Sequence, residues 1–259
     1  MDEIGAITGY IDVAQLVLYV FWLFFAGLII YIRMEDKREG YPLESTHKPG
    51  EKYGIFFPPY PGEKQFRLDH GEQRDYSSGR RDTREIALTP LAPWEGAPFA
   101  PTGDALADGV GPASYAERAD EPDLTGEGEL KVVPTRIAGD FTIAARDPDP
   151  HGMPVIGTDG AIGGTVKDVW VDRIDLMIRY LEVETGGEDG ATVLVPMPFA
   201  KVDRRRGRIL VAAIRADQFA GVPKTASPDR VTRLEEDRIA GYFGGGRLYA
   251  TPDRQEPFV

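Results

Sequence analysis

An uninterrupted apolar run near the N-terminus constrains this chain more than any other feature. Residues 13–32 lie between Asp12 and Arg33 and contain no charged side chain. At a rise of about 1.5 Å per residue, a helix over this run is roughly 30 Å long, the thickness of the hydrocarbon core of a bilayer. The sequence therefore predicts one transmembrane helix at 13–32, which anchors the polar remainder of the chain.

The flanks of this run argue against a cleaved signal peptide and predict an orientation. Residues 1–12 hold acidic side chains but no Lys or Arg, and the charged segment 33–38 stands where a cleavage site would follow. The first Lys and Arg residues of the chain lie in that segment. By the positive-inside rule, residues 1–12 form a periplasmic N-terminus and the body of the chain lies in the cytoplasm.

The middle of the predicted span holds a tryptophan, Trp22, beside the small residues Ala26 and Gly27. Tryptophan is usually found at membrane interfaces, whereas small residues let helices approach one another closely. Two interpretations follow. The helix packs on other membrane helices through Trp22, Ala26 and Gly27, or Trp22 faces lipid without a partner.

Composition excludes several classes of function. The net charge of −12 and the absence of a basic stripe exclude nucleic acid as a partner. There is no cysteine, which rules out disulfides, thiolate catalysis and iron–sulfur clusters. His47, His70 and His151 are isolated, so we expect no metal site. None of them lies in the span, so the helix offers no imidazole to a pigment or haem.

The body divides into two regions of different character. Residues 33–134 follow the span, and 40–134 hold 12 of the 21 prolines without a sustained helical or alternating period. This stretch is rich in aromatic residues, which favours an extended segment laid on partner subunits over a free linker, although both stay open. Residues 135–250 are predicted to form the folded domain, and 251–259 a C-terminal tail.

The folded domain is predicted to be α+β, with a small antiparallel β-barrel-like sheet and a C-terminal helix. The strands are expected at 165–171, 180–184, 192–195 and 208–211, separated by glycine-containing turns. In 180–184, polar Tyr180, Glu182 and Glu184 alternate with apolar Leu181 and Val183, which predicts one buried and one wet face. The helix is expected to begin at Ser227 and Pro228 and to end at the glycines 244–246.

Several blocks of the chain, taken in order, carry a resemblance to a known family. The span and its exit resemble the H subunit of the purple bacterial photosynthetic reaction centre, and further blocks do so through the body. The blocks are 21–44, 100–104 with 108–115, 164–172, 179–184 and 234–242. The resemblance covers about residues 10–250.

The resemblance implies a cytoplasmic barrel domain that caps the L and M subunits in the chromatophore or intracytoplasmic membrane. It implies that the chain stabilises that core, shields the secondary quinone and provides proton paths for light-driven reduction to quinol. Bacteriochlorophyll, bacteriopheophytin, quinones, non-haem iron and carotenoid would be held by other subunits. Antenna ring polypeptides, a cytochrome subunit and membrane lipids are further expected partners.

Carboxylates suit a proton relay because burial and like-charge neighbours raise their pKa values toward the working pH. The best candidates near the quinone are Asp172, Asp175, Arg179 and Glu182, with Glu235 as an inner member. By the resemblance, Asp175 stands where the family can have a glutamate. The alternative is that these are solvated loop charges.

A proton entry at the surface is predicted at Asp123, Glu127, Glu129 and Lys131. By the resemblance, some family members carry histidines where this chain has Glu127 and Glu129. Glutamates also attract protons through their negative field. The alternative is a flexible acidic turn.

No enzyme motif competes with this interpretation. The chain has no phosphate-binding Walker loop, no Gly-x-Ser-x-Gly sequence and no pairing of a nucleophile with histidine. We therefore expect no autonomous catalytic site. The alternative function is a membrane-anchored barrel adaptor of a different membrane complex.

Overall fold

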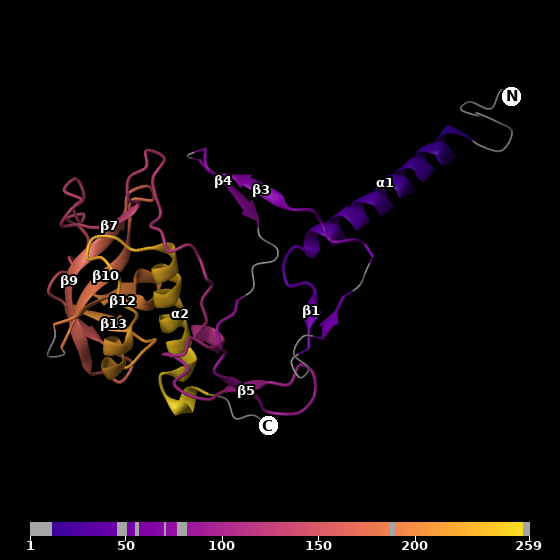
Figure 1. The fold of residues 1–259 in the computed structure, drawn as a ribbon. Coiled ribbons are helices and arrows are strands. Elements are labelled where there is room, and N and C mark those ends of the chain that lie inside the picture. Colours follow the sequence, from indigo (N-terminus) through magenta and orange to yellow (C-terminus); the bar gives the residue numbers. More distant parts are fainter. Residues whose placement is uncertain are drawn as a thin grey trace. The chain divides into compact units, whose positions relative to one another are not determined.

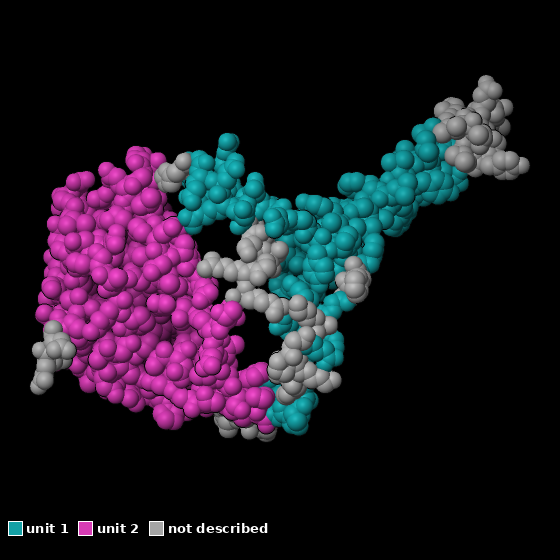
Figure 2. Space-filling view, in the orientation of Figure 1, with its two compact units in different colours: residues 1–81, 92–98 teal, residues 82–91, 99–259 magenta. Residues whose placement is uncertain are grey.

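The computed structural model describes residues 12–45, 51–54, 57–69, 71–76, 82–186 and 190–255. The chain forms two compact units, which Figure 2 shows in different colours. The first unit comprises residues 1–81 and 92–98, and the second comprises 82–91 and 99–259. The second unit therefore includes part of the stretch that was expected to be irregular.

The apolar run forms a single long helix, α1 (Val13–Asp36) (Figure 1). Its mean hydropathy is 2.4 over the most apolar window, and none of its residues is buried. Asp12 caps it by accepting the N–H of Gln15 at 2.7 Å. The helix begins where the sequence predicts and ends four residues later, because ion pairs such as Arg33–Asp36 (2.9 Å) support a further polar turn.

The rest of the first unit contains two short antiparallel ladders. Strand β1 (Leu43–Glu44) pairs with β2 (Lys52–Tyr53), and β3 (Lys64–Arg67) pairs with β4 (Gln73–Tyr76). These strands bury almost nothing, and large apolar side chains such as Leu43 remain exposed. His47 and His70 lie outside the described residues.

The second unit is built on one sheet whose strands follow the order β11-β10-β9-β8-β13-β12, with β7 added beside β9. The strands are β7 (Val132–Pro134), β8 (Pro154–Ile156), β9 (Ile162–Asp172), β10 (Met177–Thr185), β11 (Thr192–Pro196), β12 (Ala200–Asp203) and β13 (Arg208–Val211). All pairs are antiparallel except β8 with β13. The order has two ends, so the described sheet is barrel-like but not closed. The predicted α+β class and all four predicted strands are confirmed.

Short elements complete the second unit. They are the strand pair β5 (Leu88–Pro90) and β6 (Phe99–Pro101), and the 3₁₀ turns η1 (Gly111–Ala113), η2 (Met197–Phe199), η3 (Ala216–Gly221) and η4 (Pro252–Arg254). The helix α2 (Arg233–Tyr249) follows the sheet in the chain.

The predicted wet face on β10 is confirmed at Glu184, which is exposed, and was wrong at Tyr180 and Glu182. Tyr180 is 6% exposed and Glu182 is 5% exposed, while the alternate residues Leu181 and Val183 are fully buried. The second face is covered because the Tyr180 hydroxyl donates to Glu236 of α2 at 2.7 Å, and an arginine reaches Glu182 from the segment after β7. Tertiary contacts thus bury polar atoms that the alternation assigns to solvent.

Both predicted ends of α2 were wrong as well. The helix begins after Thr232, whose hydroxyl accepts the N–H of Glu235 at 3.2 Å, and not at Ser227 and Pro228. It also runs through the three glycines 244–246. A Cβ at Gly245 would meet the Cβ of Ala113 at 2.4 Å, so these residues are small to admit close packing and do not end the helix.

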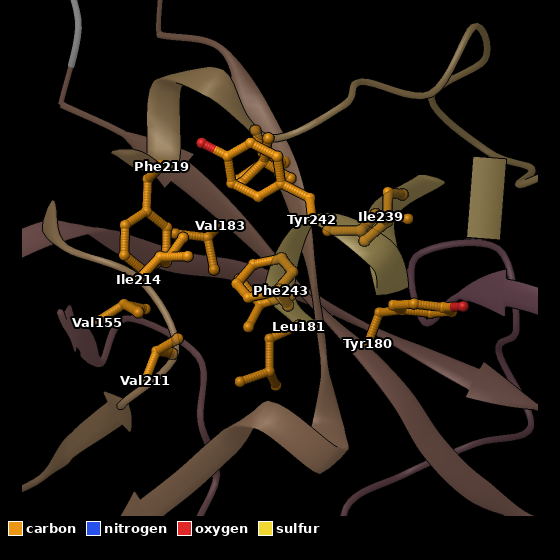
Figure 3. Close-up of a cluster of buried hydrophobic side chains, with 14 of the residues drawn as sticks. Val155, Tyr180, Leu181, Val183, Val211, Ile214, Phe219, Ile239, Tyr242 and Phe243 are labelled. Carbon is orange, nitrogen blue, oxygen red and sulfur yellow. The ribbon is translucent and has the colours of Figure 1, made fainter. Parts of the chain in front are cut away.

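The core of the second unit lies between the sheet and α2. Phe243 is fully buried, and the centroid of its ring lies 6.5 Å from the centroid of the Phe219 ring (Figure 3). Aliphatic side chains of the strands, including Leu181 and Val183, surround the two rings (Figure 3). This core holds the ends of β9 and β10 rigidly, which positions the polar side chains described next.

Candidate functional site

A buried carboxylate lies at the end of β9, where the chain turns into β10. Asp172 is 0% exposed, and its Oδ1 accepts the backbone N–H groups of Ile174 (2.9 Å) and Asp175 (3.0 Å). Among the described residues its Oδ2 has no hydrogen-bond partner. Lys131 Nζ and Arg179 Nε face that oxygen from 3.5 and 3.9 Å.

Lys131 links this buried carboxylate to an exposed one. Its Nζ lies 3.8 Å from Asp175 Oδ2, and the Asp175 side chain is 50% exposed. Burial raises the pKa of Asp172, but the two backbone N–H groups and the Lys131 ammonium outweigh burial and lower it overall. In this chain Asp172 is therefore ionised at neutral pH. We call Lys131, Asp172, Asp175 and Arg179 the β9–β10 cluster.

The predicted proton entry lies directly beside this cluster. Residues 124–130 form a tight hairpin in which the N–H of Thr125 donates to the carbonyl of Glu129 at 2.8 Å. Arg173, in the β9–β10 turn, donates to Glu129 Oε2 at 2.8 Å. The structure thus brings Glu129 and Lys131 to the β9–β10 cluster, while Asp123 and Glu127 extend toward solvent. In the part of the chain that is described, no three His, Asp or Glu side chains are arranged to hold a metal ion.

Glu182 does not lie in the β9–β10 cluster. It accepts from the indole N–H of Trp170 at 2.9 Å and from Arg136 Nη1 at 2.7 Å. The same Arg136 nitrogen donates to Asp168 Oδ2 at 3.0 Å, and His151 Nε2 approaches Asp168 Oδ1 at 3.5 Å. We call these five side chains the Arg136 network. It is a second buried ionic group, separate from the first.

Glu235 holds the start of α2. Its carboxylate accepts the N–H of Thr232 at 2.8 Å and the N–H of Ala226 at 2.6 Å, and the residue is 7% exposed. These are the bonds of a capping box with one added loop contact. The geometry accounts for Glu235 as a structural residue, and a relay role for it remains a prediction.

The proposed packing residues of α1 are all exposed. Trp22 is 56% exposed and its ring contacts only Phe21 and Phe25 of the same helix among the described residues. A Cβ at Gly27 would meet nothing within 4 Å, and Ala26 is exposed too. This surface is available to a neighbouring helix, and which group covers it remains a prediction.

Sequence reasoning missed three side chains that organise these groups. Arg136 and Asp168 build the second network, and Arg173 joins the hairpin to the β9–β10 turn. The sequence did contain one signal. Asp168, Trp170 and Asp172 occupy alternate positions of one strand, which places three side chains with hydrogen-bonding atoms on the same face. No local pattern marks Arg136, because its partners lie 32 and 46 residues away.

Comparison with protein families agrees with this architecture. The model of the photosynthetic reaction centre H-chain N-terminal region matches residues 5–137, just over half of the chain. The model of the PRC-barrel domain matches residues 144–218, which include β8–β13. In the described part of the chain, one apolar helix long enough to cross a membrane lies within the first match, and strands of the barrel-like sheet lie within the second. The chain therefore belongs to the photosynthetic reaction centre H-chain family and is an accessory, membrane-anchored subunit of a reaction centre complex.

Proposed function

We propose that the β9–β10 cluster and the adjoining hairpin carry protons from the cytoplasm toward a quinone held by partner subunits. Reducing a quinone to a quinol consumes two protons, and a quinone covered by protein needs a relay to receive them. The observation that carries this proposal is Asp172 Oδ2, a fully buried carboxylate oxygen without a hydrogen-bond partner among the described residues. An oxygen of this kind can accept a bridging water and, once the pKa of Asp172 is raised, a proton.

The hairpin and the cluster are joined through Arg173, whose backbone N–H donates to the carbonyl of Lys131 at 2.9 Å. A proton would need a bridging water to pass from the Glu129 carboxylate to the cluster, because an arginine does not release its proton. Glu129 lies beside Arg173, and Lys131 contacts both Asp172 and Asp175. Asp172 is ionised in the isolated chain because its pKa is lowered. When a partner covers the turn and removes water, the pKa of Asp172 would rise, which would let it hold a proton in transit.

Exposed apolar side chains support the idea that this turn is covered in the complex. Ile174 is 54% exposed, Leu176 is 73% exposed and Met177 is 51% exposed. Leu176 also has a positive φ of 51°, a conformation that costs energy for a leucine. Such a turn presents an apolar rim around the carboxylates and fits a docking surface for the L and M subunits.

The remaining parts of the proposal follow from family membership. The chain would stabilise the L and M core and shield the secondary quinone. Bacteriochlorophyll, bacteriopheophytin, quinones, non-haem iron and carotenoid would be bound by other subunits, with an antenna ring and a cytochrome subunit as neighbours. Residues 1–12 would be periplasmic and the barrel cytoplasmic, in the chromatophore or intracytoplasmic membrane.

The deciding experiment measures second-electron transfer to the quinone against pH in the intact complex carrying Asp175→Asn. If Asp175 passes protons, the rate falls by about tenfold or more, because a positioned acid–base group contributes roughly 10²–10⁴-fold to proton transfer. Asp140→Asn, an exposed carboxylate elsewhere on the second unit, is the matched control and should leave the rate unchanged. An unchanged rate in Asp175→Asn would remove that residue from the relay.

Metal inhibition tests the entry. By the resemblance, Glu127 and Glu129 stand where some family members carry histidines, so Zn²⁺ and Cd²⁺ should block quinone protonation only weakly in this chain. Replacing both by histidine should create a strong block. Strong inhibition of the unaltered complex would contradict the assignment.

An absorption spectrum separates this function from that of an adaptor of a different complex. The chain, purified with its partners after gentle solubilisation, should carry near-infrared bacteriochlorophyll bands. A pigment-free complex would favour the adaptor.

A further inference from the structure

The turn between β12 and β13 concentrates positive charge in an otherwise acidic chain. Asp203 pairs across the hairpin with Arg208, and the residues between them are three arginines followed by Gly207. Gly207 has a φ of +59°, which lets the chain reverse tightly. The side chains of 204–206 are exposed at the tip. We call 203–208 the arginine turn.

The acidic residue of this turn is already neutralised within it. Arg208 Nε donates to Asp203 Oδ2 at 3.2 Å, and the backbone N–H of Arg206 donates to Asp203 Oδ1 at 3.3 Å. Arg208 and Arg206 help to lower the pKa of Asp203 against the effect of burial. The three arginines at the tip face solvent, and Asp203 sets one negative charge against the four arginines of the turn.

A second segment adds to the positive surface. Arg204 Nη1 donates to the backbone carbonyl of Arg146 at 3.2 Å, which brings another exposed arginine beside the turn. The nearby acids are few: Asp147 is exposed next to Arg146, and Asp149 is engaged by His151 at 2.5 Å. Arg146 and the four arginines of the turn thus lie beside two acidic residues, Asp147 and Asp203, in a chain whose net charge is −12.

We propose that the arginine turn binds the phosphate groups of anionic phospholipids at the surface of the membrane that α1 crosses. The guanidinium group presents a planar fork of donors that matches two phosphate oxygens at once. All four cationic residues of the turn are arginines. This inference goes beyond the proton relay and does not depend on it.

A lipid surface fits these residues better than a protein partner. Residues 203–208 contain no apolar or aromatic side chain. Hot spots of protein interfaces are tryptophan, tyrosine and arginine side chains packed in desolvated pockets, and the turn offers no aromatic side chain to build one, whereas an anionic membrane attracts exposed arginines by charge alone. The anchor α1 also keeps the second unit tethered to a membrane, which raises the effective concentration of headgroups at the turn.

The test uses the full chain in nanodiscs, with a spin label that reports distance from the lipid headgroups. Because the chain has no cysteine, Lys201→Cys gives a single label on β12 next to the turn. Gly186→Cys, after the far end of β10, is the control position, where a side chain meets no neighbour within 4 Å. Relaxation by nickel-chelating lipids measures proximity in phosphatidylglycerol and in phosphatidylcholine discs.

We expect the label at 201 to lie near the headgroups in phosphatidylglycerol and to move away in phosphatidylcholine or high salt. Each arginine should change the docked-to-free ratio about fivefold, so the triple change Arg204→Gln, Arg205→Gln and Arg206→Gln should lower it roughly 100-fold. The corresponding lysine variant should retain only part of the docking, because it keeps the charge but loses the contact with two phosphate oxygens at once. The control Lys167→Gln, Lys224→Gln and Arg230→Gln, with the same change in net charge, should retain it fully.

Three results would overturn the proposal. They are docking that is insensitive to lipid charge, an equal loss in the control variant, and proximity that appears only when partner subunits are added. The last result would assign the turn to an acidic protein surface. None of these measurements involves quinone reduction, so their outcome does not test the proton relay.

Discussion

Glu182 shows how a single acceptor holds two donors inside an apolar sheet. Its Oε2 receives both the Trp170 indole N–H and Arg136 Nη1, and Trp170 is 1% exposed. A buried indole N–H that loses its acceptor costs the free energy of its lost hydration, since no water replaces the bond. The role of Glu182 is thus to satisfy donors that the core itself creates.

Two substitutions at this residue should separate hydrogen bonding from charge. Glu182→Leu should lower the free energy of unfolding by about 1–3 kcal/mol, because the Trp170 N–H loses its acceptor. Glu182→Gln should cost clearly less, since its amide oxygen still accepts that bond. Chemical unfolding of the solubilised chain, followed by circular dichroism, measures both. Equal losses would mean that the charge on Glu182, and not the bond, is what matters.

His151 is a titratable side chain that joins a loop to the sheet. Its Nδ1 lies 2.5 Å from Asp149 Oδ1, and its Nε2 lies 3.5 Å from Asp168 Oδ1 on β9. Burial disfavours the charged ring, but the Asp149 carboxylate, with a smaller contribution from Asp168, raises the pKa of His151 above its usual 6.5. The protonated ring bridges two carboxylates, so its charge stabilises the fold.

This contribution should depend on pH in one direction. A raised pKa in the folded state gives stability that is fully present below about 6.5 and is lost as the pH rises through the raised value. The lowered pKa values of Asp149 and Asp168 affect only acidic solutions, below about 3.8. The loss should be less than about 1 kcal/mol because the ring is partly exposed. The free energy of unfolding, measured from pH 5 to 8, should fall with rising pH in the natural chain and should change less in His151→Gln.

At the scale of elements, α2 packs by means of its glycines. Gly245 lies against Ala113 of η1, and Gly246 lies against Ile214 and the carbonyl of Ala213, each closer than a Cβ allows. The missing side chains let the helix axis approach these backbones directly. The intrinsic helical cost of glycine is therefore offset by contacts that no larger residue permits.

Gly245→Ala should test this packing. Although alanine favours a helix, its Cβ would meet Ala113 at 2.4 Å, so we expect a net loss of about 1–3 kcal/mol from overpacking. Gly244→Ala is a close comparison, because its nearest neighbour is the carbonyl of Pro112 at 3.2 Å, and it should cost less. Comparing the free energies of unfolding of the two variants tests this packing. A stabilised Gly245→Ala variant would show that the helix can shift.

Elements with a strong local signal could be predicted from sequence. The apolar run defines α1, and β-branched residues between glycine turns define β9, β10, β11 and β13. The ends of α2 could not, because glycine usually ends a helix and its contact here comes from a residue over 130 positions away. The parallel pairing of β8 with β13 depends likewise on tertiary contacts that no local pattern encodes.

The candidate site was predictable to the same degree. Asp172, Asp175 and Arg179 lie close together in the sequence around one tight turn, so sequence proximity was a sound guide to them. Lys131 is distant in the sequence, and only the fold brings it to Asp172 and Asp175. Glu182 is separated from them because it lies opposite Asp168, further along the β9–β10 ladder. Strand register, which sequence does not specify, decides which carboxylates meet.

At the scale of the whole molecule, the positive charge that follows α1 predicts its orientation in the membrane. An introduced cysteine at Asp2 and another at Lys201 should react from opposite sides of the membrane, since the chain contains no other thiol. In sealed vesicles with the cytoplasmic face outward, a membrane-impermeant maleimide should label the second site and spare the first. Labelling of the N-terminal site alone would reverse the orientation.

The two oxygens of Asp172 are not interchangeable, and this limits which substitutions are informative. Oδ1 must accept two backbone N–H groups, so an asparagine there would have to keep its carbonyl on that side. Its amide NH₂ would then point toward the Lys131 ammonium and the Arg179 guanidinium, donor against donor. Asp172→Asn would therefore open the turn as well as remove a charge. Among side chains of this size, only a carboxylate can accept two backbone N–H groups with one oxygen and face two cations with the other.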